Sequence, residues 1–313
     1  MRKVILILGP TAVGKTSVAI ELAKTLKTEI ISSDSMQIYR YMDIGTAKPT
    51  PEQRQEVTHH MIDIINPWEY FSTGQYIEKV KEIIEKLINE GKTPIVVGGT
   101  GLYLKAMTEG IFKGPSADWQ LRKKLIEEEK SQPGTLYNLL KELDPVAAAK
   151  IYPADLRRIV RALEVFFKEK RKISELQLAL TKPLPYEYIK IGLIRDRKEL
   201  YSLIEKRVDQ MLEEGLIEEV RRVLTLIKKN VKTEIPLPAL QAIGYKEIAG
   251  YIADMYSLEE AVRLIKKRTK TYAKRQFTWF KKDKDIKWFD ITSKSNPKEI
   301  AEEIYLLHLV YQI

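Results

Sequence analysis

Residues 4–26, VILILGPTAVGKTSVAIELAKTL, place an apolar run, a glycine-rich turn and a helical pattern in direct succession. Val4–Leu8 is the continuous apolar run expected of a strand buried on both faces. The stretch after the turn repeats apolar residues every four positions, as on one face of a helix. Between them, residues 9–16 fit the pattern G-x-x-x-x-G-K-[ST]. A strand, this turn and a helix in that order predict a phosphate-binding loop.

The predicted loop carries groups that bind a diphosphate or a triphosphate. Its glycines let backbone amides point inward, and the N-terminus of the following helix adds positive potential. Lys15 supplies a positive charge, and the Thr16 hydroxyl is expected to be a ligand for Mg²⁺. The predicted diphosphate-binding residues are Gly9, Pro10, Thr11, Ala12, Val13, Gly14, Lys15 and Thr16.

Further strand and helix patterns alternate up to about residue 115. Apolar runs at 30–31, 59–65 and 94–97 are interpreted as strands. Ser72 and Gln75 have the spacing of a capping box and predict the start of a helix. Strands that alternate with helices indicate crossover units, so we expect an α/β fold with a parallel sheet.

The pattern changes between residues 116 and 184, where only helical patterns rich in charged residues and leucine occur. A strand pattern returns at Tyr188–Ile194, followed by one amphipathic helix over residues 200–224. We interpret 116–184 as an all-helical insertion domain in a core made of 1–115 and 185–313. Two consecutive domains are the alternative, but they would leave the late strand without a sheet.

Composition restricts the class of protein. The chain has 313 residues, 44% of them hydrophobic, and 53 Lys plus Arg against 43 Asp plus Glu. A net charge of +10 is typical both of proteins that meet a polyanion and of proteins with a basic surface. The absence of cysteine excludes disulfides, zinc–thiolate sites and a thiol nucleophile, and fits a reducing compartment. No segment approaches the ~20 apolar residues of a membrane span, so we expect a soluble, cytoplasmic protein.

The second strand runs into an acid in EIISSDSMQIYR, residues 29–40. Open parallel sheets bind ligands at the carboxyl ends of their strands, so Asp34 should face the cleft that holds the phosphates. The carboxylate could cap the next helix, orient the water ligands of a metal, or simply be solvated. A sharper hypothesis is that Asp34 is a general base, which takes a proton from a nucleophile.

The strand predicted at 94–97 lacks the acid with which NTP hydrolases usually hold their metal. PIVVGGTG, residues 94–101, ends in two glycines and Thr100. The missing acid counts against a function as a motor or switch protein.

Six strings resemble, in order, the landmarks of the tRNA dimethylallyltransferase family, also called tRNA isopentenyltransferases. They are GPTAVGKT (9–16), SSDSMQIYRYMDIGTAKP (32–49), VVGGTGLYL (96–104), RRIVRALEV (157–165), ALQAIGYKEI (239–248) and YAKRQFTWF (272–280). The resemblance implies transfer of a dimethylallyl group from dimethylallyl diphosphate to N6 of adenosine 37 in tRNA, with release of diphosphate. It also implies a kinase-like P-loop core and a helical insertion that grips the anticodon stem-loop.

The same resemblance assigns roles to particular residues. Asp34 corresponds to the general base, and Thr100 to a residue near the bridging oxygen of the diphosphate. Many relatives have Gln-Arg where this chain has Arg157-Arg158, which leaves the role of Arg157 open. The expected catalytic residues are Asp34, Lys15, Thr16 and Thr100. The expected tRNA contacts are Asp34, Ser35, Met36, Gln37, Thr100, Arg122, Arg157, Arg158, Ile159, Val160 and Arg161.

The densest basic cluster is KKRTKTYAKRQ, residues 266–276. Helical spacing places Lys267, Lys270 and Lys274 on one side, as either a solvated face or a face near the cleft or the RNA.

Other conspicuous residues are given structural roles. We expect Trp279 and Phe280 in the core. His59 and His60 have no partners at metal-ligand spacing, so we expect them to be structural.

Two rival functions share the phosphate loop. A small-molecule or nucleotide kinase would transfer phosphate from ATP to a metabolite. An RNA-binding NTPase would show RNA-stimulated ATP hydrolysis. We favour the prenyltransferase, with Mg²⁺, tRNA and dimethylallyl diphosphate as partners and a monomer as the expected state.

Overall fold

The computed structural model describes residues 2–231 and 237–310. It divides into two compact units, residues 1–104 with 185–313, and Lys105–Leu184. The helical insertion expected at 116–184 lies within the second unit. No helix in the described part of the chain is long and apolar enough to cross a membrane.

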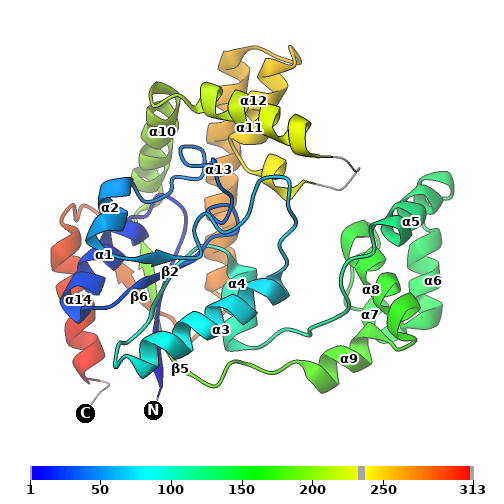
Figure 1. Cartoon of the computed structure of the whole chain (residues 1–313), viewed down its shortest axis with the longest axis horizontal. Helices are drawn as coiled ribbons and strands as arrows, with labels where there is room; N and C mark the ends of the chain where they lie inside the picture. Colours follow the sequence, from blue (N-terminus) through cyan, green and yellow to red (C-terminus); the bar gives the residue numbers. More distant parts are fainter. Residues whose placement is uncertain (1, 232–236, 311–313) are drawn as a thin grey trace. The chain divides into compact units, whose positions relative to one another are not determined.

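Unit 1 is built on a six-stranded parallel sheet with the strand order β3-β2-β4-β1-β5-β6 (Figure 1). The strands are β1 Lys3–Leu8, β2 Ile30–Ser33, β3 His59–His60, β4 Ile95–Gly98, β5 Glu187–Ile194 and β6 Lys287–Asp290. Strand β1 lies inside the sheet, which explains its unbroken apolar run. At the carboxyl end, Leu8 pairs with Gly98 and Gly192, and Gly98 also pairs with Ser33.

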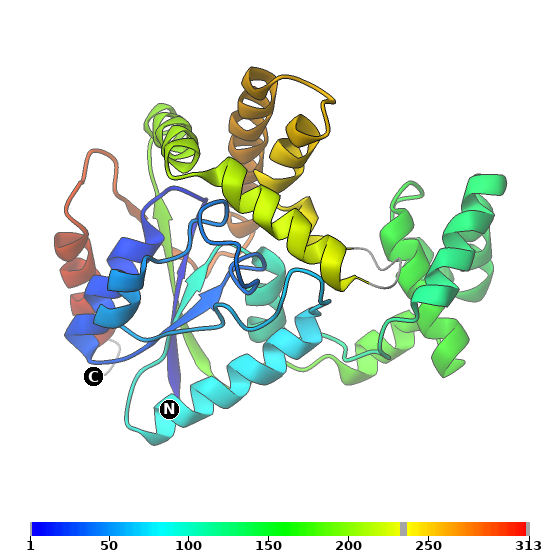
Figure 2. The same ribbon diagram turned by 45° about the horizontal axis from the view of Figure 1, so that its top comes forward.

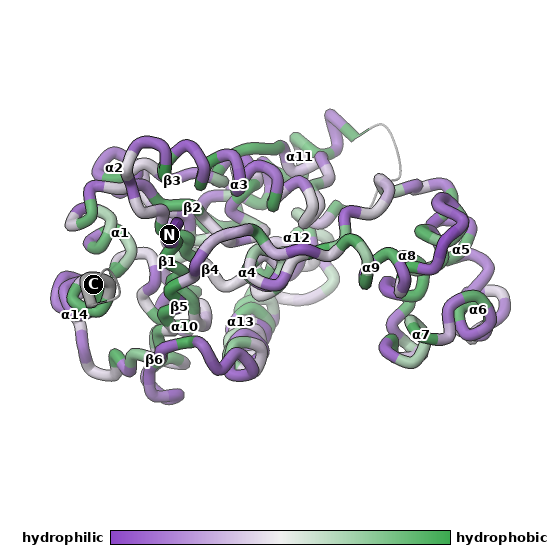
Figure 3. Tube along the Cα trace, turned by 90° about the horizontal axis from the view of Figure 1, so that it is seen from below, coloured by the Kyte–Doolittle hydropathy of each residue, from purple (hydrophilic) through white to green (hydrophobic). Residues whose placement is uncertain are grey.

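Helices cover the sheet and also lie beyond the carboxyl ends of its strands. They are α1 Lys15–Leu26, α2 Pro51–Glu56, α3 Thr73–Asn89, α4 Gly101–Thr108, α10 Arg197–Glu213, α11 Leu216–Asn230, α12 Tyr245–Ile252, α13 Leu258–Phe280 and α14 Pro297–Val310, with the 3₁₀ turn η1 Pro238–Gln241. One core packs α1 and α14 against β1 and its neighbours, which form the hydrophobic stretches in Figure 3. A second core packs α11, α12 and α13 around Ile38, Tyr39 and Met42.

All the regular secondary structure in the described residues of unit 2 is helical. Its helices are α5 Trp119–Ser131, α6 Thr135–Leu143, α7 Pro145–Ala148, α8 Leu156–Glu169 and α9 Ile173–Leu180, drawn in green in Figure 2. They enclose a core of their own, which includes Leu136, Leu140 and Leu163.

Local backbone geometry overturns two of the predicted elements. The strand predicted over 59–65 has only two residues, because Met61 and Asp63 adopt positive φ angles of 62° and 55° and turn the chain. The single helix predicted over 200–224 is two helices, α10 and α11, because Gly215 adopts φ 97° between them.

One predicted core residue is also wrong. Trp279 is 45% exposed, whereas Phe280 is buried as predicted. Neighbouring positions on a helix point about 100° apart, so the face that buries Phe280 leaves Trp279 exposed.

Candidate active site

A cleft of about 730 Å³ opens at the carboxyl edge of the sheet in unit 1. Its walls come from the phosphate loop, the ends of β2 and β4, the segment after β2, α10 and α13. The polar side chains that line it include Thr11, Lys15, Thr16, Asp34, Gln37, Asp43, Thr46, Lys48, Arg54, Arg207, Glu214, Tyr272 and Gln276. The structure thus brings Asp34 and the phosphate loop to one cleft.

The phosphate loop depends on its glycines. Gly9 adopts φ 143°, and a Cβ there would lie 2.5 Å from the carbonyl oxygen of Leu193 on β5. Gly14 adopts φ 109° as the N-cap of α1, and no side chain in the described chain caps this helix. The first amides of α1 are therefore available to an anionic ligand.

Two half-buried cations converge on the loop. Lys15 donates to the Pro10 carbonyl at 2.7 Å. Burial, followed by the neighbouring Arg207 cation, lowers the pKa of Lys15 to about 7, while the charge of Asp34 acts in the opposite direction. Arg207 donates to the Thr11 hydroxyl at 3.3 Å, and burial lowers the pKa of this guanidinium too. Arg207 was not predicted from the sequence, because it lies in a helix without a recognisable motif.

Gln276 joins the loop to the end of β4. Its side-chain oxygen accepts a hydrogen bond from the Thr11 amide at 2.8 Å, and its Nε2 donates to the Gly99 carbonyl at 2.9 Å. A Cβ at Gly99 would lie 2.0 Å from Nε2, so only glycine leaves room for this bridge. Gln276 lies in the quoted string YAKRQFTWF, but nothing in the spacing assigned it to the loop.

Asp34 is fixed by one of its two oxygens. Its Oδ1 accepts hydrogen bonds from the amides of Met36 at 2.8 Å and Gln37 at 3.3 Å. No hydrogen bond from a residue in the described ranges reaches Oδ2. The carboxylate thus caps a turn and not the next helix, as one of the simpler hypotheses had it, because no helix follows β2 directly. Its other oxygen remains available to a ligand.

Thr100 and Tyr272 support this turn. The Thr100 hydroxyl accepts a hydrogen bond from the Ser35 amide at 3.1 Å, and its own amide donates to Ser33 at 3.2 Å. Burial, followed by the charge of Asp34, raises the pKa of Tyr272, although hydrogen bonds with Thr100 and Gln276 act against this. The phenol of Tyr272 therefore remains protonated at the edge of the cleft.

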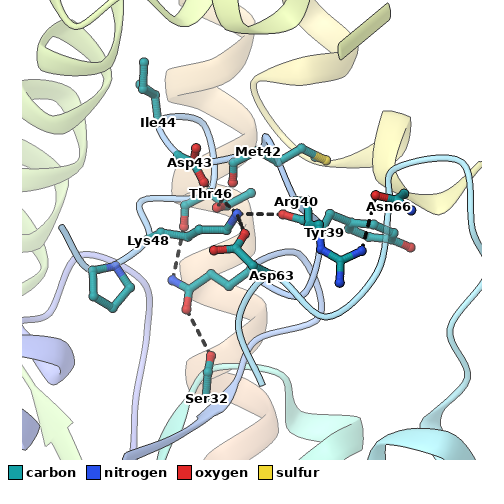
Figure 4. A network of polar contacts seen from close by, with 12 residues as sticks. Ser32, Tyr39, Arg40, Met42, Asp43, Ile44, Thr46, Lys48, Asp63 and Asn66 are labelled. Atoms are coloured by element: carbon teal, nitrogen blue, oxygen red, sulfur yellow. Dashed lines mark hydrogen bonds and ion pairs between the residues drawn. The ribbon is translucent and has the colours of Figure 1, made fainter. Parts of the chain in front are cut away.

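The side chain of Gln37 is already used within the protein. Its oxygen accepts from the Ser32 hydroxyl at 3.0 Å, and its Nε2 donates to the carbonyls of Thr46 at 3.3 Å and Ala47 at 3.1 Å (Figure 4). These bonds hold the turn that carries Asp34 against the segment that follows it.

Unit 2 holds the other predicted tRNA contacts in two different environments. Arg122 and Arg161 both bind the fully buried carboxylate of Glu164, at 2.7 Å and 2.5 Å. Glu164 was not predicted, although it falls in the string RRIVRALEV.

The remaining predicted contacts lie at the start of α8. Arg157 and Arg158 are exposed and form no ion pair with another residue in the described ranges. Ile159 and Val160 are buried in the core of unit 2, so their side chains offer no surface.

The basic cluster of α13 faces away from the cleft. Lys267, Lys270 and Lys274 line a separate groove of about 500 Å³ with residues of α10. On the same helix, Tyr272 and Gln276 line the cleft.

The histidines differ from each other. His60 pairs with Glu29 at 2.6 Å. His59 lines the cleft, its Nδ1 lies 2.7 Å from the Val57 carbonyl, and burial lowers its pKa. No group of three His, Cys, Asp or Glu residues in the described chain could hold a metal ion.

The chain is similar to known proteins of one family. The family model described as IPP transferase matches residues 37–283. A tRNA dimethylallyltransferase of Thermodesulfovibrio yellowstonii is 70% identical over 97% of this chain and 96% of its own, and one of Thermotoga maritima is 48% identical over 93% of each.

Solved structures give the same result. The tRNA isopentenylpyrophosphate transferase of Bacillus halodurans matches with a TM-score of 0.71 and 40% identity, over 98% of this chain and 96% of its own. A eukaryotic dimethylallyltransferase acting on tRNA matches with a TM-score of 0.76 and 31% identity, over 93% of this chain and 74% of its own. This chain therefore belongs to the IPP transferase family, the family of the tRNA dimethylallyltransferases.

Proposed function

We propose that this protein transfers the dimethylallyl group of dimethylallyl diphosphate to N6 of adenosine 37 in tRNA. The products are diphosphate and N6-(dimethylallyl)adenosine. The observation that carries the proposal is that Lys15, Arg207 and Asp34 line one cleft, and that Asp34 Oδ2 accepts no hydrogen bond from a residue in the described ranges. Mass spectrometry of nucleosides from unmodified tRNA, treated with this protein, Mg²⁺ and dimethylallyl diphosphate, tests it directly.

The diphosphate becomes a leaving group when its growing charge is neutralised. Lys15 and Arg207 line the cleft, and the first amides of α1 have no side-chain cap in the described chain, so these groups would neutralise that charge. Preorganised groups of this kind are each typically worth about 10²–10³ in rate.

The acceptor is a weakly nucleophilic aromatic amine. Its N6 forms the new C–N bond to C1 of the allylic donor as the C1–O bond breaks, and the amine then becomes strongly acidic. Asp34 has only to accept this proton on Oδ2, so an ordinary carboxylate is sufficient as the base.

Mg²⁺ is the metal that fits these residues. It prefers oxygen ligands and usually keeps several waters while it bridges substrate phosphates, so it needs no dedicated cluster of protein ligands. Thr16 lies in the cleft and would hold the ion through its hydroxyl. When bound, Mg²⁺ would neutralise charge on the diphosphate.

We further propose that unit 2 grips the anticodon stem-loop. A stacked base cannot reach a cleft unless it is flipped out, which costs a few kcal/mol that contacts to the rest of the tRNA must offset. Arg157 and Arg158 supply exposed charge for backbone phosphates. The proposal includes action as a monomer, in the cytoplasm.

A kinase is the alternative that the comparisons do not favour. It would transfer phosphate from ATP to a metabolite and release no pyrophosphate from an allylic donor. Incubation with ATP and candidate metabolites separates the two functions.

Above neutral pH, Lys15 is expected to take up a proton when diphosphate binds. Free Lys15 has a pKa of about 7, so most molecules have a neutral Lys15 at pH 8. A bound diphosphate stabilises the charged form and raises this pKa, so affinity should fall as pH rises through about 7. Calorimetric titration with inorganic pyrophosphate, in buffers of different ionisation enthalpy, measures the uptake.

Lys15→Met is the control for this measurement. The variant should show only the proton exchange of the ligand itself. Equal uptake by the variant and the unaltered protein would rule out Lys15 as the source.

Arg158→Ala is expected to weaken tRNA binding and to flatten its salt dependence. Loss of one phosphate contact should reduce the slope of log K against log salt by about 0.7–0.9. Filter binding of tRNA at several salt concentrations measures the slope. Arg171→Ala removes another exposed arginine of unit 2 and serves as the control. Equal slopes in the two variants would refute a contact specific to Arg158.

A further inference from the structure

One wall of the cleft is an irregular segment, residues 39–48. Asp43, Ile44, Thr46, Ala47 and Lys48 line the cleft from it. The segment contains no helix or extended strand, so other groups must satisfy its backbone and fix its path. Two buried charges of opposite sign do so, Lys48 within the segment and Glu219 from α11.

Glu219 binds the middle of the segment. Its Oε2 accepts hydrogen bonds from the amides of Asp43 and Ile44, both at 2.9 Å, and its Oε1 accepts from the Gly45 amide at 3.0 Å. The Tyr245 hydroxyl donates to the same Oε1. Burial and the neighbouring carboxylate raise the pKa of Tyr245, so the phenol remains a donor. Four donors thus fill the acceptor capacity of one carboxylate that is only 3% exposed.

Lys48 binds the two ends of the segment. Its Nζ donates to the Tyr39 carbonyl at 2.6 Å and contacts the carboxylates of Asp43 at 2.7 Å and Asp63 at 2.5 Å (Figure 4). This uses all three donors of the ammonium group.

Hydrogen bonds, together with the backbone between Gly45 and Ala47, connect Glu219 to the turn of Asp34. Directly after Gly45, the carbonyls of Thr46 and Ala47 accept from the side chain of Gln37. The Gln37 amide in turn donates to Asp34 Oδ1. A displacement of Gly45 would therefore reach the group that fixes the orientation of Asp34.

We propose that Glu219 is a positioning residue for prenyl transfer. It fixes the backbone of the cleft wall at Asp43–Gly45 and, through Gln37, the orientation of the Asp34 carboxylate. The inference rests on the proposed function. Glu219 touches neither the phosphate loop nor a reacting atom. It should therefore govern the rate of transfer and leave diphosphate binding intact.

The isosteric change Glu219→Gln separates this role from simple packing. If the new NH₂ group replaces Oε2, it faces two backbone amides. If it replaces Oε1, the Tyr245 hydroxyl can rotate and accept from it, but the Gly45 amide still loses its acceptor. Each orientation releases at least one amide of the wall.

Gly45→Ala disturbs the same wall from the other side. A Cβ at Gly45 would lie 2.5 Å from the Tyr245 ring and 2.9 Å from Leu216. The backbone of the segment must therefore shift, although Glu219 itself is unchanged.

Both variants are expected to lower kcat about 10–100-fold, because misplacement by about 1 Å can cost 10²-fold in rate. Both should bind inorganic pyrophosphate within about twofold of the unaltered protein, since the Gly9–Thr16 loop is untouched. Hydrogen exchange at the amides of residues 43–45 should be faster in Glu219→Gln. Glu218→Gln, an exposed glutamate one position away on α11, is the control for lost charge and should leave all three measurements unchanged.

Two outcomes would overturn the role of Glu219. One is an unchanged kcat with unchanged hydrogen exchange in Glu219→Gln. The other is a parallel loss of kcat, pyrophosphate affinity and thermal stability in both variants, which would indicate general destabilisation. Failure of the proposed function would appear differently, as an unaltered protein that does not prenylate tRNA while the exchange difference persists.

Discussion

Asp34→Asn should lower the rate of dimethylallyl transfer about 10²–10⁴-fold, the usual contribution of a general base. Asparagine can keep the side-chain oxygen that accepts from the Met36 and Gln37 amides, so the turn should survive. Only the charge and the proton acceptor are lost. Single-turnover transfer at saturating tRNA measures the change, and filter binding should show tRNA affinity preserved.

Asp196→Asn is a closely matched control for this substitution. Asp196 Oδ1 accepts from the amides two and three positions ahead, at 2.8 Å and 3.2 Å, as Asp34 does, but it does not line the cleft. The control should transfer at the normal rate. If Asp34→Asn also kept most of its activity, Asp34 would not be the base.

Arg207→Met should reduce kcat/KM for dimethylallyl diphosphate about 10²–10³-fold, because it removes a preorganised cation from the leaving group. Methionine fills a similar volume without the charge. The change should also raise the pKa of free Lys15, whose value the Arg207 cation lowers. Proton uptake on pyrophosphate binding at pH 8 should therefore shrink in this variant.

Lys206→Met removes the neighbouring cation of α10, which is exposed and outside the cleft lining, and it should behave as the unaltered protein. A normal pyrophosphate affinity in Arg207→Met would contradict a role for Arg207 in the diphosphate site. A normal proton uptake would contradict its influence on Lys15.

The elements that the sequence predicted are those with strong local signals. The apolar run of β1, the glycine turn and the capping box of Ser72 and Gln75 each appear in the structure. The errors at residues 59–65 and at Gly215 arose where positive φ angles interrupt a favourable pattern. Hydrophobic periodicity carries no information about such backbone angles.

The candidate site was only partly predictable for a related reason. The phosphate loop and Asp34 lie at strand ends, where topology alone brings them to one edge. Arg207, Gln276 and Glu219 reach the cleft or its wall from helices far along the chain, and only tertiary packing reveals their partners. The roles of Ser35, Met36, Arg122 and Arg157 in tRNA binding stay predictions.

The crowding at the end of β4 limits which chemistries this scaffold could acquire by mutation. A Cβ on Gly98 would lie 2.1 Å from the Ser33 carbonyl oxygen, and Gly99 is as tightly confined by Gln276. An acid grafted at Gly98 to hold a metal for nucleotide hydrolysis would force β4 and β2 apart, whereas one at Gly99 would displace the side chain of Gln276 that bridges to the phosphate loop. An evolutionary route from this enzyme to a hydrolase by a single replacement at Gly98 is therefore sterically blocked, whichever acid is tried.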